Sequence, residues 1–553
     1  MLAGWTMKVF EALANALREE SVTEIFGLMG DGNLRFLSCW TDSLGGTYYG
    51  TRHESAAVAM ADGYSRASGR VGVCTVTQGP GVTNTLTALV TARKAGSKVL
   101  LLAGDVAGAQ QGWPQDIDHQ ALFDAAGVPL VHIEDPATPY SDIVRAYRMV
   151  ASGGGPVGVD MPIDVQEMEW DAWKDEPAAT ERPGPADRPR DDLVSRAVEV
   201  LLAGRRPVVI AGRGVVEAGC EADLVEIADR TGALLATTLR GKGLFDGERF
   251  LVGIAGGLGT NLSAKLIGEA DTALVVGAGL NDFTTMHKTL LRDSAKVVNF
   301  DLVPGRVPFP TAELVEVVGD AAVTVPELLA ALRACDARSE GYRTPAMAEE
   351  LDAFEPESEL SLAEGGPYLD PRALTIQLDA ILPKDRVVVT DAGHFFGNPC
   401  TYMRVDGPRS FVCGIDFGSI GLGIGHAMGA SVAHPGRPVV LFVGDGGLLM
   451  SLGDLETAVR YRLPLVIVVM NDASYGSELQ IMRVWGLPEA LSVFPRVDFA
   501  AIGDAVGLRG VSITSARDLE RLGDLGAIPG PVVLDCAISR DVRAAWLDEA
   551  FSR

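Results

Sequence analysis

Two aspartates, Asp445 and Asp472, each follow an apolar run that is typical of a buried β-strand. Asp445 stands between Gly444 and Gly446, which predicts a sharp turn into a helix. Because neighbouring parallel strands end at the same edge of a sheet, we expect both carboxylates to lie there side by side. Carboxylate oxygens suit Mg2+, and the N–H groups of a helix N-terminus suit phosphate. These residues therefore predict a metal site that carries a diphosphate.

The elements around this pair are predicted from the spacing of apolar residues. Residues 438–443 form an apolar run that stops abruptly at the glycines, which predicts a strand. From Leu448 to Val459 the leucines recur at helical spacing, and a second apolar run at 463–470 predicts the next strand. This order is a strand–helix–strand unit of a parallel sheet.

The composition excludes several classes of protein. Hydrophobic residues make up 47% of the 553 residues, with no apolar run long enough to cross a membrane. The net charge of −26 argues against binding to nucleic acid or to anionic membrane surfaces. Seven cysteines without a Cys-x-x-Cys pair favour reduced thiols over disulfides or a zinc site. Residues 7–20 look like an amphipathic helix rather than a signal peptide, so we expect a cytoplasmic protein.

Two segments have the composition of linkers, 171–192 and 338–371. The remaining pieces, 1–170, 191–338 and 365–553, each alternate β-like runs with helical patterns. We therefore expect an α/β protein of three doubly wound parallel-sheet domains.

The first domain has its own acids after predicted strands. Asp31 follows a strand and a glycine turn, and Glu54 ends a predicted strand at 48–54, just before an alanine-rich helix. A helix cap explains Asp31, and an interaction with the helix dipole explains Glu54, without any catalytic role.

At Asp445, Asp472 and the glycines beside them, the chain resembles the thiamine-diphosphate-dependent 2-oxo acid enzymes, which include acetolactate synthases and pyruvate-type decarboxylases. Their signature is Gly-Asp-Gly followed some two dozen residues later by Asn-Asn. Here Asp472 replaces the second Asn, which keeps an oxygen ligand and adds a negative charge. The resemblance covers essentially the whole chain and implies a pyrimidine-binding, a central and a diphosphate-binding domain. It implies as metal ligands Asp445, the Asp472 side chain and the backbone carbonyl of Ser474.

The segment around Glu54, Arg-His-Glu-Ser-Ala-Ala, matches the cofactor-activating glutamate of this family. That glutamate hydrogen-bonds N1′ of the aminopyrimidine and promotes the imino tautomer, which takes the proton from C2 of the thiazolium. The resemblance implies this role for Glu54, against the alternative of a helix-dipole partner.

Other segments match the parts of the family's site that hold the cofactor. Ile420 occupies the position of the large apolar side chain that forces the V shape of the cofactor, and it would also be a core residue. The carbonyl of Gly418 would accept a hydrogen bond from the 4′-amino group. The other cofactor-binding positions that the match implies are Gly79, Gly393, His394, Gly444, Gly446, Gly447 and Tyr475.

Residues 113–120 resemble two patterns of the family at once. Gln115 matches a glutamine that lines the active site of acetolactate synthases. His119 falls near the catalytic His pair of pyruvate-type decarboxylases, although its neighbour here is Gln120. A single His is more often a surface or hydrogen-bonded residue, so both interpretations stay open. Earlier in the chain, Gln78 replaces the Ser that is usual in the acetolactate-synthase pattern.

Two acids bear on the fate of the intermediate that decarboxylation leaves. Glu478 lies where decarboxylases of the family have a glutamate next to the reacting carbons and where acetolactate synthases have an apolar residue. Asp31 matches the catalytic Asp of the same decarboxylases. Two such carboxyl groups at one centre could relay a proton. The alternatives are a helix cap for Asp31 and a solvated helix face for Glu478.

The central domain has two strand-to-glycine turns, at 207–214 and 274–279, and a third strand that ends in Asp301. In acetolactate synthases this domain binds FAD, and in other relatives ADP or nothing. Tight turns explain the glycines equally well. Gly279-Leu-Asn-Asp282 departs from the Ala-Arg-Phe-Asp of the synthases, which puts FAD or ADP in doubt.

These observations predict an enzyme that depends on thiamine diphosphate and Mg2+. It would decarboxylate a small-molecule 2-oxo acid and then protonate the intermediate or ligate it to a second carbonyl. The alternatives are an acetolactate synthase proper, a 2-hydroxyacyl-CoA lyase and a noncatalytic cofactor-binding homologue; the presence of Glu54, Ile420 and the metal ligands speaks against the last. By resemblance we expect a homodimer or homotetramer with the site between subunits, and neither a nucleic-acid nor a membrane partner.

Overall fold

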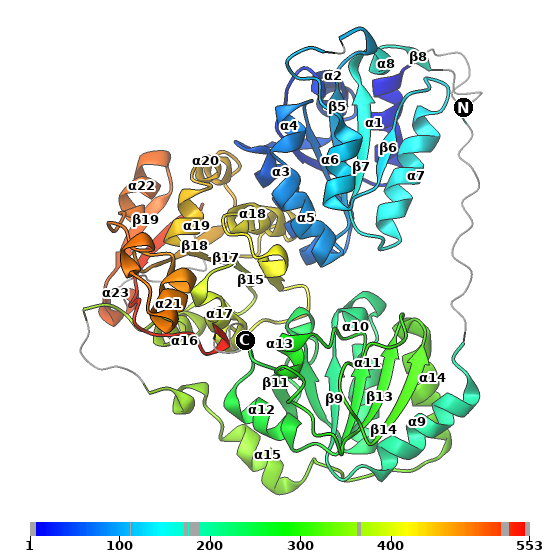
Figure 1. The fold of residues 1–553 in the computed structure, drawn as a ribbon, viewed down its shortest axis with the longest axis vertical. Helices are drawn as coiled ribbons and strands as arrows, with labels where there is room; N and C mark the ends of the chain where they lie inside the picture. Colours follow the sequence, from blue (N-terminus) through cyan, green and yellow to red (C-terminus); the bar gives the residue numbers. More distant parts are fainter. Residues whose placement is uncertain are drawn as a thin grey trace.

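The computed structural model describes residues 7–110, 112–170, 175, 188–361, 367–520, 522 and 530–547. Three parallel six-stranded sheets, each flanked by helices, make up three domains (Figure 1). Each sheet lies inside one of the three predicted pieces of the chain. The predicted fold class, three parallel α/β domains, is confirmed.

The sheet of the first domain has the strand order β3-β2-β4-β5-β7-β6. A short antiparallel pair, β1 (Met7–Lys8) with β8 (Glu169–Trp170), ties the beginning of this domain to its end. The strands of the six-stranded sheet are β2 (Glu24–Gly27), β3 (Thr47–Gly50), β4 (Gly72–Val76), β5 (Val99–Asp105), β6 (Leu130–His132) and β7 (Val157–Pro162). Its helices are α1 (Val9–Glu19), α2 (Leu34–Ser38), α3 (Glu54–Ser68), α4 (Pro80–Thr83), α5 (Leu86–Ala95), α6 (His119–Ala126), α7 (Pro139–Ala151) and α8 (Ile163–Gln166).

The central domain has the strand order β11-β10-β9-β12-β13-β14. Its strands are β9 (Pro207–Ala211), β10 (Leu234–Thr237), β11 (Leu251–Ile254), β12 (Thr272–Val276), β13 (Lys296–Asp301) and β14 (Glu313–Val318). Its helices are α9 (Asp191–Ala203), α10 (Arg213–Ala218), α11 (Glu221–Thr231), α12 (Asn261–Gly268), α13 (Asp282–Thr285), α14 (Ala321–Ala334) and α15 (Pro345–Asp352).

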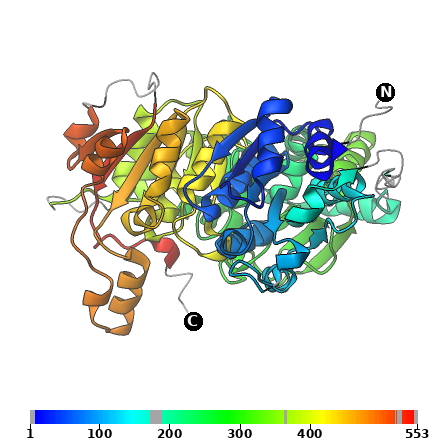
Figure 2. The same ribbon diagram turned by 90° about the horizontal axis from the view of Figure 1, so that it is seen from above.

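The third domain has the strand order β16-β15-β17-β18-β20-β19. Its strands are β15 (Val387–Thr390), β16 (Phe411–Cys413), β17 (Val439–Gly444), β18 (Leu465–Asn471), β19 (Arg509–Ile513) and β20 (Val532–Ala537). Its helices are α16 (Pro371–Ile381), α17 (Gly397–Tyr402), α18 (Gly423–Ala433), α19 (Asp445–Leu449), α20 (Gly453–Arg460), α21 (Gly476–Trp485), α22 (Phe499–Val506) and α23 (Ala516–Glu520). An orange helical segment projects from this domain in Figure 2, where α21 is found.

Helices α3 and α18 join the first domain to the third (Figure 1). Their backbones touch, because a Cβ on Gly63 would collide with the carbonyl of His426 and one on Gly429 with the carbonyl of Met60. His426 also contacts the buried carboxylate of Asp62, with 3.0 Å between Nε2 and Oδ2. Small residues on both helices therefore fix how the two domains meet.

Three predicted elements differ from the structure. Glu54 does not end a strand: β3 stops at Gly50, and Glu54 begins α3 because the Nδ1 atom of His53 accepts a hydrogen bond from the N–H of Ser55 and caps the helix. The predicted helix after Gly446 is two helices, α19 and α20. The expected linker at 338–371 contains α15, whose buried Met347 packs on the central core.

The expected linker at 171–192 lies mostly outside the described residues, and α9 begins within it, at Asp191. The amphipathic pattern at 7–20 forms β1 and then α1, whose Leu13 and Leu17 are buried. Among the described helices, none is both long enough and apolar enough to cross a membrane.

Candidate active site

Asp445 and Asp472 lie at the carboxyl ends of adjacent strands. β17 and β18 are paired in parallel with Gly444 opposite Met470, so the acids that follow them share one edge of the sheet. Both are almost fully buried, at 2% and 3% exposed. Burial, together with the negative charge of Asp472, raises the pKa of Asp445 to about 7. Burial likewise raises the pKa of Asp472.

The oxygen atoms of this pair fit a divalent cation. Oδ1 of Asp472 accepts hydrogen bonds from the N–H of Ser474, at 2.9 Å, and from its hydroxyl, at 2.8 Å. Oδ2 of Asp445 is buried and has no hydrogen-bond partner among the described residues. A buried carboxylate oxygen without a donor is costly unless a cation completes it. Two hard oxygen donors side by side are what Mg2+ prefers.

Close contacts leave no room for side chains at three glycines beside this pair. A Cβ on Gly446 would lie 2.7 Å from the ring of Tyr475, and one on Gly447 2.8 Å from Oδ2 of Asp391. A Cβ on Gly476 would lie 2.5 Å from Nδ1 of His394. These contacts bring Tyr475, His394 and the glycines of α19 together around the carboxylate pair.

Asp391 is a member of this cluster that the sequence reasoning did not select. Its Oδ2 accepts a hydrogen bond from the N–H of Gly421 at 2.8 Å, and its buried Oδ1 has no partner in the described part of the chain. Burial raises its pKa to about 6, against the hydrogen bond from Gly421. The hydrogen bond between Gly421 and Asp391 holds the segment that carries Ile420 beside Gly447. The acid after β15 was the signal that could have identified it.

His394, Gly393 and Gly418 lie in the same third-domain cluster or next to it. Nδ1 of His394 is 3.5 Å from Oδ2 of Asp472, and its Nε2 is 3.3 Å from the carbonyl of Val542. Gly418 has φ +75° and Gly393 φ +150°, backbone conformations that suit glycine. Of the residues predicted on the third domain, His394, Tyr475, Gly446 and Gly447 thus lie around Asp445 and Asp472.

Glu54 lies at the first turn of α3 and is 9% exposed. Its Oε2 accepts a hydrogen bond from Nδ2 of Asn84 at 3.0 Å. Just before it, the N–H of Arg52 donates to Asp454 of α20 at 2.8 Å. The strand end expected around Glu54 is replaced by a capped helix start, and Asn84 is a partner that spacing alone does not identify.

Gln78 connects two of the predicted residues in the first domain. Its Nε2 donates to Oδ1 of Asp31 at 2.8 Å and to Oε1 of Gln115 at 3.0 Å. Gln78 itself is buried, whereas Asp31 is exposed. A Cβ on Gly79 would lie 2.5 Å from the carbonyl oxygen of Gln115, so the turn and the Gln115 loop are in contact.

His119 is buried and both its ring nitrogens face protein groups. Nδ1 lies 2.9 Å from Oδ1 of Asp160, and Nε2 is 3.4 Å from the N–H nitrogen of Gly79. A direct acid–base role for His119 would require one of these contacts to break.

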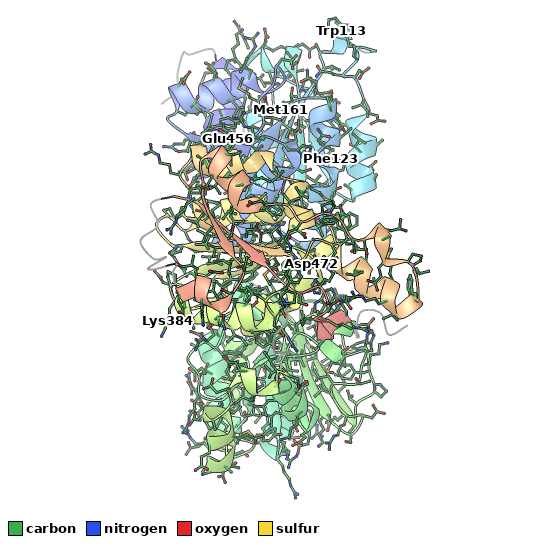
Figure 3. The ribbon with its side chains drawn as sticks, turned by 90° about the vertical axis from the view of Figure 1, so that its left-hand side faces the viewer. Trp113, Phe123, Met161, Lys384, Glu456 and Asp472 are labelled. Carbon is green, nitrogen blue, oxygen red and sulfur yellow. The ribbon has the colours of Figure 1, made fainter. Side chains whose placement is uncertain are left out.

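Glu478 is exposed on the first turn of α21. Within the described residues, no hydrogen bond joins it to Asp31. Figure 3 places Trp113, two residues from Gln115, at the outer end of the first domain and Asp472 near the middle of the molecule. One chain therefore presents two separate clusters of predicted residues, one on the first domain and one on the third.

Backbone packing requires Gly212, Gly214 and Gly277 in the two strand-to-glycine turns of the central domain, whereas Gly279 has open space around it. A Cβ on Gly212 would collide with the carbonyl of Gly277, and one on Gly214 would lie 2.7 Å from the Cα of Gly277. The turns after β9 and β12 therefore lie directly against each other, which explains these glycines without a nucleotide.

Comparisons with known proteins agree with this fold. Three family models match in order: thiamine pyrophosphate enzyme, N-terminal TPP binding domain (residues 7–122), central domain (194–328) and C-terminal TPP binding domain (391–536). The acetolactate synthase large subunit of Parasynechococcus marenigrum is 30% identical over 96% of this chain and 87% of its own length. A probable acetolactate synthase large subunit of Methanocaldococcus jannaschii is 30% identical over 96% of this chain and 92% of its own length. The acetolactate synthase isozyme 3 large subunit of Escherichia coli is 28% identical over 92% of this chain and 90% of its own length.

Three parallel α/β domains with an acid pair at a glycine-rich strand end define a cofactor-dependent enzyme of the lyase or transferase type. The chain belongs to the thiamine pyrophosphate enzyme family. Its cofactor is thiamine diphosphate, and it acts in decarboxylation or carboligation of 2-oxo acids, which confirms the predicted family and reaction class.

Substitution of Asp445 tests whether it binds the metal. Asp445→Ala should weaken retention of Mg2+ and thiamine diphosphate at least about 100-fold, because one of the two carboxylate ligands of the metal would be lost. Cofactor content after gel filtration at graded Mg2+ measures this. Asp504→Ala, which removes an exposed acid of α22, is the matched control. An Asp445 variant with unchanged cofactor content would contradict the assignment.

Proposed function

We propose that this chain decarboxylates a 2-oxo acid with thiamine diphosphate held through Mg2+, and that its own acids decide whether a proton or a second carbonyl then reacts. The observation that carries the proposal is the buried pair Asp445 and Asp472, with an unpartnered oxygen at the edge of the sheet. Bound there, the cofactor supplies the electron sink that makes loss of CO2 possible.

The residues of the third domain would hold and orient the cofactor. Asp445, Asp472 and the carbonyl of Ser474 would bind Mg2+, and the N–H groups at the start of α19 would bind phosphate oxygens. Ile420, held by the contact between Asp391 and Gly421, would support the ring system from below. Gly393, His394, Gly446, Gly447 and Tyr475 would line the same site.

Glu54 would donate a proton to N1′ of the pyrimidine and so activate the cofactor. Its low exposure favours this role, because little water competes for the carboxyl group. The hydrogen bond from Asn84 fixes one of its oxygens and leaves the other available.

A second copy of the chain would complete the site. The two clusters lie apart in one chain, and each is bordered by exposed apolar side chains. Met29 and Trp113 border the first-domain cluster, and Met450 and Tyr475 the third-domain cluster. Pairing of two chains would bury these side chains and bring Glu54 of one to the Asp445 loop of the other.

Dilution tests this assembly. We expect at least a dimer in sedimentation experiments, with activity lost in parallel with dissociation. A monomer with full specific activity would rule out a site shared between chains.

Turnover of a panel of 2-oxo acids tests the reaction. The holoenzyme should release CO2 from at least one of them. Glu54→Gln should lower the rate by about 10²–10⁴-fold and slow H/D exchange at C2 of the cofactor, while thiamine diphosphate still binds. Glu169→Gln, an exposed acid of the same domain, should change neither. Full C2 exchange in Glu54→Gln would exclude the activating role.

Glu478 separates a decarboxylase from an acetolactate synthase. If Glu478 and Asp31 deliver the proton, Glu478→Gln should reduce aldehyde release by about 10²–10⁴-fold, leave C2 exchange fast and shift products toward ligation. The aldehyde-to-ligation ratio measures this, with Glu520→Gln on exposed α23 as the control. An unchanged ratio with full turnover would favour an acetolactate synthase, the activity that the relatives' names carry.

A further inference from the structure

A line of hydrogen bonds runs behind the Gly79 turn, from the protein surface into the first domain. It starts at His132, whose side chain is 35% exposed, at the end of β6. Nδ1 of His132 is 3.2 Å from Oδ2 of Asp160 on β7, and the other oxygen of Asp160 is 2.9 Å from Nδ1 of His119. Asp160 and His119 are both 3% exposed. One buried carboxylate thus bridges two imidazoles.

The hydrogen bonds around His132 assign its protons. Nε2 of Gln120 donates to Asp124 at 2.7 Å, which turns Oε1 of Gln120 toward Nε2 of His132, at 2.9 Å. Nε2 of His132 must therefore carry a proton. Its Nδ1 faces a carboxylate oxygen and needs a proton as well, so His132 bonds to Asp160 as an imidazolium.

His119 has the opposite requirement. Its Nδ1 donates to Asp160, and its Nε2 faces the N–H of Gly79 at 3.4 Å, so this Nε2 must be the unprotonated acceptor. Gly79 has φ +60° and its Cα packs against the carbonyl of Gln115, which limits how the turn can move. Neutral His119 is thus the form that fits the turn.

The turn carries Gln78, which donates to both Asp31 and Gln115. A movement of the Gly79 turn would change the placement of these two candidate active-site residues together. The line from His132 to Gln78 therefore joins the surface to the first-domain half of the site.

We propose that Asp160 and His132 are positioning residues. Asp160 fixes the Nδ1-protonated tautomer of His119, and the charge of His132 favours its neutral form. In that form His119 fixes the Gly79 turn, and protonation of His119 loosens the turn. The effect on catalysis rests on the proposed function, whereas the proton assignments do not.

The charges that face His119 set the pH at which this happens. Burial disfavours its imidazolium, but Asp160 and Asp105 outweigh burial and raise the pKa of His119, while His132 acts against them. Asp105 is itself held at a raised pKa of about 6 by burial and by repulsion from Asp160. The active form is the neutral one, so activity is lost as pH falls through a His119 pKa that lies above the usual value of about 6.5.

Substitutions of His132 and Asp160 should shift the acid limb, the fall in activity at low pH, in opposite directions. His132→Gln removes a positive charge beside His119, so its pKa should rise and the limb should move to higher pH. Asp160→Asn removes the carboxylate that stabilises the imidazolium, so the limb should move to lower pH, while kcat at the optimum falls about 10- to 100-fold because the turn loses its support. The control is His434→Gln, which replaces a half-buried histidine whose Nε2 contacts the carbonyl of Ala67. It should change neither the acid limb nor kcat at the optimum.

The experiment combines pH profiles of kcat and kcat/KM with 15N NMR of histidine-labelled holoenzyme. NMR should show a neutral Nδ1–H tautomer of His119 in the unmutated protein and its loss in Asp160→Asn. Acid limbs that stay in place in both variants would overturn the proposal, as would a second bound metal that Asp160→Asn loses and Asp445→Ala keeps. If the unmutated enzyme turns over no 2-oxo acid, the proposed function fails, and the NMR result still decides the proton assignments.

Discussion

The repulsion between two buried carboxylates is the constraint on which the third domain depends. The paired ends of β17 and β18 force Asp445 and Asp472 together, and burial keeps water from separating their charges. Either a proton or a cation must be present, and the raised pKa of Asp445, about 7, reflects this. The glycines beside the pair allow Tyr475, Asp391 and His394 to pack closely around it. The fold thus stores an electrostatic cost at the place where a metal-bound diphosphate would relieve it.

A second constraint places the first domain. Helices α3 and α18 meet backbone to backbone, and α3 begins at Glu54. Hydrogen bonds from Arg52 to Asp454 and the contact between Asp62 and His426 add polar links to the same interface. The direction of α3, and with it the position of Glu54, therefore depends on a contact with another domain as well as on the local cap.

The sequence predicts the features that depend on where apolar runs stop. The ends of β17 and β18, and hence Asp445 and Asp472, could be located because buried strands give way abruptly to polar residues. The start of α3 was placed wrongly, since the cap comes from the side chain of His53. Partners such as Asn84 and Asp160 could not be predicted, because their hydrogen bonds join residues brought together by topology alone.

The backbone contact between α3 and α18 also limits how the enzyme can move. Side chains can change rotamer to absorb a shift, but two backbones in contact can only stay together or separate. We therefore expect the first and third domains of one chain to move together. We therefore expect entry of small molecules and exit of products to depend on segments outside this interface, such as the projecting α21 with its exposed Val484 and Trp485.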